Sequence, residues 1–122
     1  DCLLSRGLGD VYKRQPLIVI AFLIAFLVRA SVGSSIVAMT MASGIMASMP
    51  AMADSSTLYR AAMCCAICGG ATALSHVNDA GFWLVSTFLE IDEKTTLKSW
   101  TIMETLIGIT GLILGLVISI FA

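Results

Sequence analysis

The sequence has few charged residues and no excess of either sign. Only 12% of its 122 residues are charged, whereas an average soluble domain carries about 25%. Seven basic residues oppose eight acidic ones, which gives a net charge of −1. This balance provides neither the basic surface that binds nucleic acid nor the polybasic run that binds anionic lipid headgroups. We therefore expect no nucleic-acid partner.

Apolar residues, in contrast, are abundant. They make up 58% of the chain, and the mean hydropathy is +0.97. Their runs are longer than a strand or a core helix needs, which excludes an ordinary soluble globular protein. Disorder is excluded too, because it requires low hydrophobicity and high net charge. A helix crosses the hydrocarbon core of a bilayer with about 20 apolar residues, so the composition predicts an all-α integral membrane protein in the lipid bilayer.

Metal ligands are also scarce, since histidine occurs once and cysteine four times. Cys65 and Cys68 have the bare C-x-x-C spacing, but no second pair follows, and a single histidine cannot complete a four-ligand site. Small residues inside an apolar run more often let helices approach closely in lipid. We therefore predict helix packing for this segment, with no metal and no cofactor. No nucleophile–base pair is evident either, so enzymatic activity is not expected.

Residues 1–15 differ in character from the rest of the chain. They hold three of the seven basic residues and show neither helical nor strand periodicity. Two interpretations remain open. The segment is a loop before the first span, or it is a non-native leader, because its ending DVYKRQ is similar to translated sequencing-adapter read-through. The fold prediction therefore rests on residues 16–122, the expected transmembrane region.

Two of the apolar segments are irregular. Residues 16–49 are too long for one span and are interrupted by Arg29 and a Gly-Ser-Ser tripeptide, and residues 80–89 are only half a span. Residues 58–74 and 100–122 are closer to ordinary spans. Non-helical backbone at membrane depth survives only where protein or a water-filled cavity covers it. Interrupted segments also point to the binding site of a transporter. The pattern predicts multi-pass transmembrane helices with broken or re-entrant segments.

Arg29 is the first candidate functional residue, because a charge at the centre of a membrane helix costs about 2.5–3.5 kcal/mol. It could extend from a helix end toward the interface. Alternatively, its guanidinium could bind a carboxylate substrate or pair with a buried acid. Gly33, Ser34 and Ser35 follow closely, and they could unwind the helix and offer N–H groups and hydroxyls to an anion.

The pentad of residues 75–79, SHVND, is the strongest local signal. If it is helical, Ser75, His76 and Asp79 share one face. A histidine beside an aspartate then has the chemistry that a proton-coupled carrier needs. The alternative is a loop between two spans in which Asp79 caps the next helix.

Glu104 lies within the first turns of the last apolar segment. An acid there interacts favourably with the helix N-terminus; the alternatives are a partner for Arg29 or a proton site. Further along, Gly111 and Gly115 form a G-x-x-x-G pair, which predicts a face for close helix packing.

Three strings in the chain are similar to the C-terminal part of the gluconate permease (GntP) family. They are RASVGSSIVAMTMASGI at residues 29–45, SHVNDAGFWLV at 75–85 and TLKSWTIMETLIGITGL at 96–112. The resemblance implies a multi-pass bacterial inner-membrane carrier that imports gluconate or a related small organic acid with protons. It also implies a longer full-length protein, which could form a homo-oligomer. The shared motifs do not distinguish gluconate from idonate, fructuronate or D-serine as the substrate. Ile36 stands where a threonine is expected, which leaves the substrate open.

The resemblance also points to individual residues, namely Gly33, Ser34, Ser35 and Thr40 and the cluster of His76, Asn78 and Asp79. Arg29 and Glu104 join them because they are charges within apolar segments. Substrate contacts are therefore expected at Arg29, Gly33, Ser34, Ser35, Thr40 and Asn78. Proton coupling is expected at His76, Asp79 and Glu104.

Two other functions remain open. One is a small membrane-anchor subunit of a redox enzyme, although a bis-histidine haem site would lack its second histidine. The other is a complete small four-helix carrier.

Overall fold

The computed structural model describes residues 2–53 and 55–121, with the side chains of residues 15–50, 52, 53 and 55–121. Every regular element in these ranges is helical, which confirms the predicted all-α class. The elements are α1 (Cys2–Val32), α2 (Ser35–Ala47), α3 (Pro50–Ala53), α4 (Thr57–Thr72), α5 (Ala80–Phe88), α6 (Glu93–Thr96), the π-helical turn η1 (Leu97–Thr101) and α7 (Ile102–Phe121).

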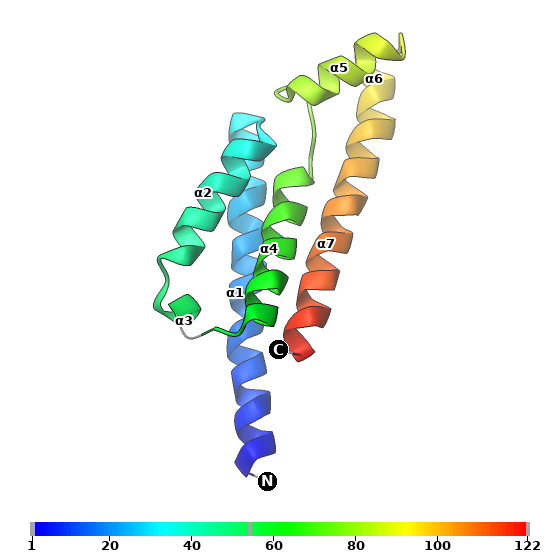
Figure 1. Cartoon of the computed structure of the whole chain (residues 1–122). Coiled ribbons are helices and arrows are strands. Elements are labelled where there is room, and N and C mark those ends of the chain that lie inside the picture. Colours follow the sequence, from blue (N-terminus) through cyan, green and yellow to red (C-terminus); the bar gives the residue numbers. More distant parts are fainter. Residues whose placement is uncertain (1, 54, 122) are drawn as a thin grey trace.

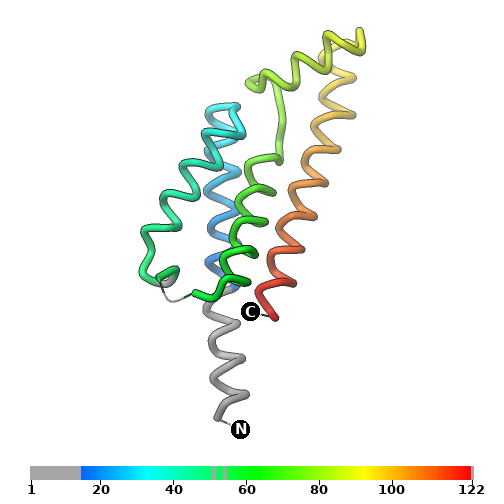
Figure 2. The backbone as a smooth tube through the Cα atoms, viewed as in Figure 1, coloured from blue at the N-terminus to red at the C-terminus, as the bar shows by residue number. Residues whose placement is uncertain are grey.

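The long helices run side by side in alternating directions (Figure 1). Helices α1 and α4 point toward one end of the bundle, and α2 and α7 return from it. Helix α4 packs against both α1 and α7, so it forms the centre of the bundle. The short α5 lies across the end where α1 ends, and an extended stretch of chain connects it to α4 (Figure 2).

The break in the first apolar segment falls where the sequence predicts it. Helix α1 ends at Val32, and Gly33 has a left-handed backbone with φ of +76°, which glycine adopts without steric penalty. Ser34 then caps α2, its Oγ accepting a bond from the Val37 N–H at 3.5 Å. Toward its other end, α1 continues without a break to Cys2, into the segment for which the sequence shows no periodicity.

Glycines bring α4 and α7 into backbone contact. A Cβ placed on Gly108 would lie 2.6 Å from the Gly69 carbonyl oxygen, and one on Gly115 would lie 2.9 Å from that of Ala62. A Cβ on Gly111 would lie 3.0 Å from the Gly69 Cα. This close approach confirms the predicted packing face around Gly111 and Gly115.

The last apolar helix begins earlier than expected. It is continuous from Glu93 to Phe121, whereas the sequence predicts a polar loop up to residue 99. Asp92 explains the early start, because its Oδ1 accepts a bond from the Thr95 N–H at 3.1 Å and caps α6. The π-helical turn then follows before α7, in the position of a π-bulge, a feature frequent at functional sites.

Within the described part of the chain, two helical stretches are long and apolar enough to cross a membrane, Gln15–Val32 and Glu93–Phe121. Their outer surfaces are apolar: Leu27 on α1 is 62% exposed, and Ile113 on α7 is 54% exposed. By contrast, α4 buries residues along most of its length, among them Tyr59, Ala66 and Gly70. Large exposed apolar side chains on long helices indicate contact with lipid.

Candidate functional site

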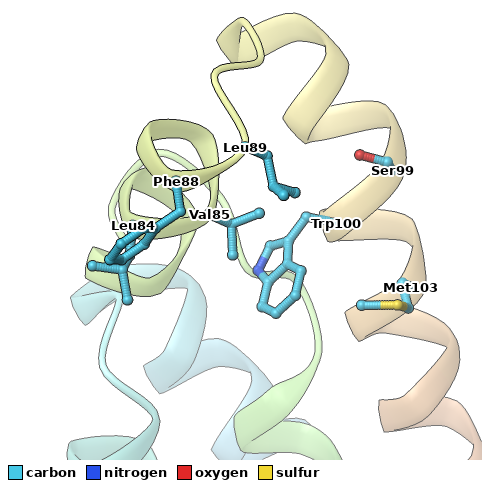
Figure 3. Close-up of a pocket in the computed structure, with 7 residues that line it drawn as sticks. All are labelled: Leu84, Val85, Phe88, Leu89, Ser99, Trp100 and Met103. Carbon is cyan, nitrogen blue, oxygen red and sulfur yellow. The ribbon is translucent and has the colours of Figure 1, made fainter.

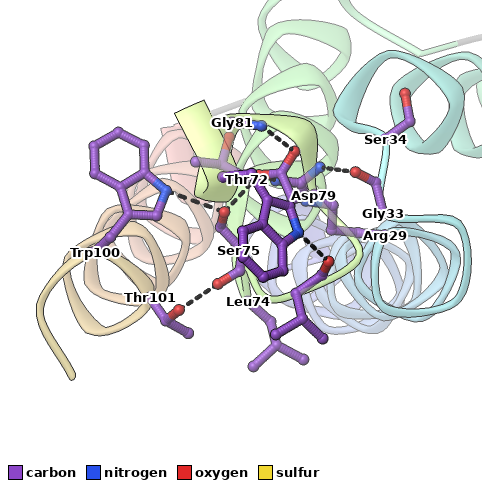
Figure 4. A network of polar contacts seen from close by, with 12 residues as sticks. Arg29, Gly33, Ser34, Thr72, Leu74, Ser75, Asp79, Gly81, Trp100 and Thr101 are labelled. Atoms are coloured by element: carbon purple, nitrogen blue, oxygen red, sulfur yellow. Dashed lines mark hydrogen bonds and ion pairs between the residues drawn. The ribbon is translucent and has the colours of Figure 1, made fainter. Parts of the chain in front are cut away.

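The two broken segments meet at one end of the bundle. The turn between α1 and α2 touches the extended chain between α4 and α5, and a Cβ on Gly33 would lie 2.2 Å from the Asn78 carbonyl oxygen. Only glycine permits this approach. Polar side chains gather around the contact (Figure 4), and the site described below consists of them.

Arg29 is the centre of this site. Its side chain is 3% exposed, and its Nη2 lies 2.6 Å from Oδ2 of Asp79. Nη1 donates to the Gly33 carbonyl at 2.8 Å. The guanidinium therefore points into the protein and pairs with the partly buried carboxylate of Asp79, rather than extending to the interface from a helix end. Nε is buried and has no acceptor among the described residues.

Asp79 begins α5 and is not part of a helical pentad. Its Oδ1 accepts the Gly81 N–H at 3.1 Å, so the side chain caps the helix while it pairs with Arg29. The chain before it has no regular structure. The loop interpretation is thus confirmed, and the helical one is wrong. The physical reason is that the chain extends after α4 and then turns, with the Asp79 N–H donating to the His76 carbonyl at 2.9 Å, so that Ser75 reaches both Asp79 and α7.

Ser75 joins three elements and is completely buried. Its Oγ donates to Oδ2 of Asp79 at 2.5 Å and accepts the Trp100 Nε1–H at 3.1 Å. Its carbonyl oxygen accepts the Thr101 hydroxyl. These bonds attach the extended chain to the π-helical turn before α7.

Leu74, at the start of the extended chain, has a left-handed backbone with φ of 57°. Such a conformation is rare and strained for a residue with a branched side chain. Its N–H is held by the Thr105 hydroxyl at 3.3 Å. The bend is therefore fixed from α7.

The proposed proton-coupling residues lie close together but are not all bonded. Glu104 is near enough to interact electrostatically with both Arg29 and Asp79. Arg29 pairs with Asp79, however, and not with Glu104. His76 buries its Nδ1, which has no partner among the described residues. The two residues share a backbone hydrogen bond, from the Asp79 N–H to the His76 carbonyl at 2.9 Å, but the described residues show no hydrogen bond between their side chains.

The proposed substrate contacts divide into two groups. Gly33 and Asn78 meet directly, and Ser34 and Ser35 follow at the start of α2. Thr40 is exposed on α2, where its hydroxyl donates to the Ile36 carbonyl. No described contact brings Thr40 to the Arg29 site.

An apolar cavity of about 480 Å³ lies next to this site, between α5 and the start of α7 (Figure 3). Its lining residues are Leu84, Val85, Phe88, Leu89, Ser99, Trp100 and Met103. The only hydroxyl among them, on Ser99, already donates to the Thr95 carbonyl. A polyhydroxylated acid needs polar partners, so this cavity does not suit one.

Sequence reasoning did not select Trp100 and Thr101 as site residues. The sequence does contain an indication of their role, because the first residues of the last predicted span carry an indole N–H and a hydroxyl within about one helical turn of Glu104. A spacing argument could not connect them with Ser75, 25 and 26 positions earlier. That pairing depends on the extended chain.

Comparison with known proteins agrees with this architecture. The family model described as GntP family permease matches residues 6–121. The chain belongs to the GntP permease family. This family consists of transporters and not of enzymes, which confirms both the resemblance and the expected lack of enzymatic activity.

Three relatives illustrate the similarity. The low-affinity gluconate transporter of Escherichia coli K12 is 40% identical over 102 residues, which cover 84% of this chain and 23% of the relative. A gluconate permease of Pseudomonas aeruginosa is 35% identical over 124 residues, which cover 97% of this chain and 27% of the relative. The inner membrane permease YgbN of E. coli K12 is 34% identical over 118 residues, covering 92% and 26%.

This GntP chain thus spans about a quarter of the length of the curated relatives it matches. No solved structure matches it significantly. The Arg29–Asp79 site accordingly comes from the geometry described above.

Proposed function

We propose that this chain forms part of the anion and proton pathway of a proton symporter for gluconate or a related small organic acid in the bacterial inner membrane. The buried guanidinium of Arg29 carries the proposal. A buried cation between two broken helices is an arrangement that can recognise a carboxylate, and two of the relatives named above are a gluconate transporter and a gluconate permease.

In this mechanism the substrate carboxylate and Asp79 compete for Arg29. Asp79 holds Nη2 at 2.6 Å, while Nε has no acceptor among the described residues. When an anion reaches the guanidinium, Asp79 loses its counter-charge and takes up a proton, because an unpaired buried carboxylate is unfavourable. One negative charge leaves Arg29 as another arrives, and the proton travels with the substrate.

Hydroxyl and amide groups around the break supply the remaining contacts. Ser34, Ser35 and Asn78 lie at the meeting point of the two segments and bind the hydroxyl or carboxylate oxygens of the acid. His76 and Glu104 lie nearby and relay the proton to or from Asp79.

Uptake of labelled gluconate tests the proposal in cells without their own carriers, using the complete gene that contains this segment. D-serine serves as the competitor that distinguishes the substrate classes within the family resemblance. Arg29→Gln should lower the apparent affinity about a hundredfold, because truncation of a buried charge partner costs several kcal/mol.

Arg60→Gln is the matched control for the loss of one arginine. Arg60 is exposed, and its bonds go to Ser55 and to the carbonyls of Met52 and Ala53, away from the site. Equal uptake by the Arg29→Gln variant and the wild type, at equal abundance, would contradict the anion role of Arg29.

Asp79→Asn and His76→Ala test the proton role. We expect Asp79→Asn to make uptake insensitive to an imposed pH gradient, since an amide cannot carry the coupled proton. Proton-coupled uptake that persists in both variants would remove these residues from the proton pathway.

A further inference from the structure

We infer that Trp100 and Ser75 are positioning residues that form a one-directional hydrogen-bond relay onto Asp79, and that this relay sets the pH at which the Arg29–Asp79 pair opens. The inference rests on the proposed function for its physiological meaning, but its geometry does not depend on the identity of the substrate. The donor and acceptor groups of Trp100, Ser75 and Asp79 determine the direction of the relay.

The indole of Trp100 determines the direction in which hydrogen bonds are donated along the relay. The Trp100 Nε1–H can only donate, so the Ser75 Oγ that receives it at 3.1 Å is an acceptor. A hydroxyl has a single proton, and that proton is left for Oδ2 of Asp79 at 2.5 Å. The relay therefore ends on a carboxylate oxygen that must accept.

The carboxylate oxygens of Asp79 accept every hydrogen bond that their described neighbours make to them. Oδ2 accepts from Ser75 and from Nη2 of Arg29, and Oδ1 accepts from the Gly81 N–H. All three bonds favour the ionised carboxylate. A proton on Oδ2 would occupy one of the two lone pairs that accept from the Ser75 hydroxyl and Nη2, and it would remove the negative charge that attracts the guanidinium, so protonation weakens the pair.

Three charged or titratable groups surround Asp79. Arg29 on α1 is bonded to it, and Glu104 on α7 interacts with it electrostatically. His76 belongs to the same extended chain and has its Nδ1 buried. None of these three donates to Ser75 in the described part of the chain, so removal of the relay leaves the charges in place and changes only the hydrogen bonding of the carboxylate.

The relay also explains why the extended chain is held so firmly. Ser75 is fully buried, and Thr101, next to Trp100, donates to its carbonyl oxygen. Two successive residues of the π-helical turn thus bind one serine. Any displacement of this turn relative to α1 weakens the Ser75–Asp79 bond, which connects the position of α7 with the charge state of the ion pair.

Infrared difference spectroscopy on the purified chain in lipid tests the relay without any substrate. The carbonyl band of the protonated Asp79 carboxyl is identified by its absence in Asp79→Asn, and its intensity is followed as the pH is lowered. In Ser75→Ala we expect the half-point to move upward by about one pH unit, since one bond to an ionised group is lost. Trp100→Phe should move it in the same direction by less.

Two variants serve as matched controls. Trp83→Phe also removes an indole N–H, but this one donates to the Val77 carbonyl at 2.8 Å and not to Ser75. Ser75→Thr keeps the hydroxyl. Both should titrate like the wild type, and if Ser75→Ala does not fold, the comparison of Trp100→Phe with Trp83→Phe decides.

Half-points that are the same in wild type and Trp100→Phe, or shifted equally by Trp83→Phe, would overturn the relay. Uptake measurements remain separate from this result. A relay that shifts as expected in a protein that takes up no gluconate would refute the proposed function alone. Uptake with unshifted spectra would refute the relay alone.

Discussion

Arg29 and Asp79 lie 50 positions apart in the sequence, yet their side chains form the ion pair of the site. Arginine suits this position because its planar guanidinium is always charged and donates in several directions at once. One nitrogen binds Asp79 and another binds the Gly33 carbonyl. The same side chain therefore fixes the turn that ends its own helix and the loop that begins α5.

Removal of the positive charge should destabilise the fold more than removal of the pair. We expect Arg29→Gln to lower the free energy of unfolding on the order of 2 kcal/mol, because it leaves the partly buried Asp79 carboxylate without its counter-charge. The double variant Arg29→Gln, Asp79→Asn should recover most of the loss. Thermal unfolding in detergent of the wild type, both single variants and the double variant gives the coupling energy. Additive losses would show that the pair is not coupled.

Gly33 is required by two independent features, its positive φ and the proximity of Asn78. Gly33→Ala should therefore cost roughly 3 kcal/mol of stability, from backbone strain and from the clash with the Asn78 carbonyl. Gly44→Ala is the matched control, because no atom lies within 4 Å of the added Cβ in α2. That variant should be neutral or gain up to about 1 kcal/mol from better helix propensity. The same thermal unfolding measurement compares the two, and an unaffected Gly33→Ala would contradict the described turn.

At the scale of elements, close contact between α4 and α7 depends on glycine. Gly108→Ala would place a Cβ 2.6 Å from the Gly69 carbonyl oxygen and 2.7 Å from the Ala73 Cβ. We expect a loss of about 1–3 kcal/mol from overpacking. Ile109→Ala, on the neighbouring exposed position, should change stability by less than about 0.5 kcal/mol. Unfolding by denaturant in mixed micelles distinguishes the two, and equal losses would argue against a glycine-mediated interface.

The cap of α6 gives a pH-dependent element outside the spans. The hydrogen bonds from Thr95 hold the pKa of Asp92 below its ordinary value. The cap therefore contributes fully above the unfolded-state pKa and is lost as the pH falls through the lower folded-state pKa. We expect the protection of the Thr95 amide, measured by NMR hydrogen exchange relative to its intrinsic exchange rate at the same pH, to fall in strongly acidic buffer. Asp92→Asn should retain protection at every pH, and Asp92→Ala should lose it throughout.

The sequence predicted the elements better than their contacts. Apolar length located α4 and α5, and the Gly-Ser-Ser tripeptide located the break after α1, because both signals are local. The partner of Arg29 could not be predicted in this way, since pairing over 50 residues depends on how the helices pack. Whether the pentad of residues 75–79 is helical could not be predicted for the same reason. Its non-helical conformation is favoured by hydrogen bonds from Trp100 and Thr101, which lie on another element.

At the scale of the whole molecule, the long helices present apolar side chains outward. This surface is typical of a chain in lipid, and the membership in a permease family agrees with it. We expect the chain, when expressed in bacteria, to stay with the membrane fraction after alkaline carbonate extraction. High pH does not weaken the hydrophobic interaction between apolar side chains and lipid. Recovery in the soluble fraction would contradict integration into the bilayer.

The separation between Arg29 and Asp79 also has a consequence for how the protein is made. Ribosomes add about 5–20 residues per second, so Asp79 is synthesised several seconds after Arg29. During that interval the guanidinium of Arg29 has no Asp79 to pair with. The ion pair, and with it the contact between the two broken segments, therefore forms only after the second segment has been made, while the residues of α7 still follow in the chain.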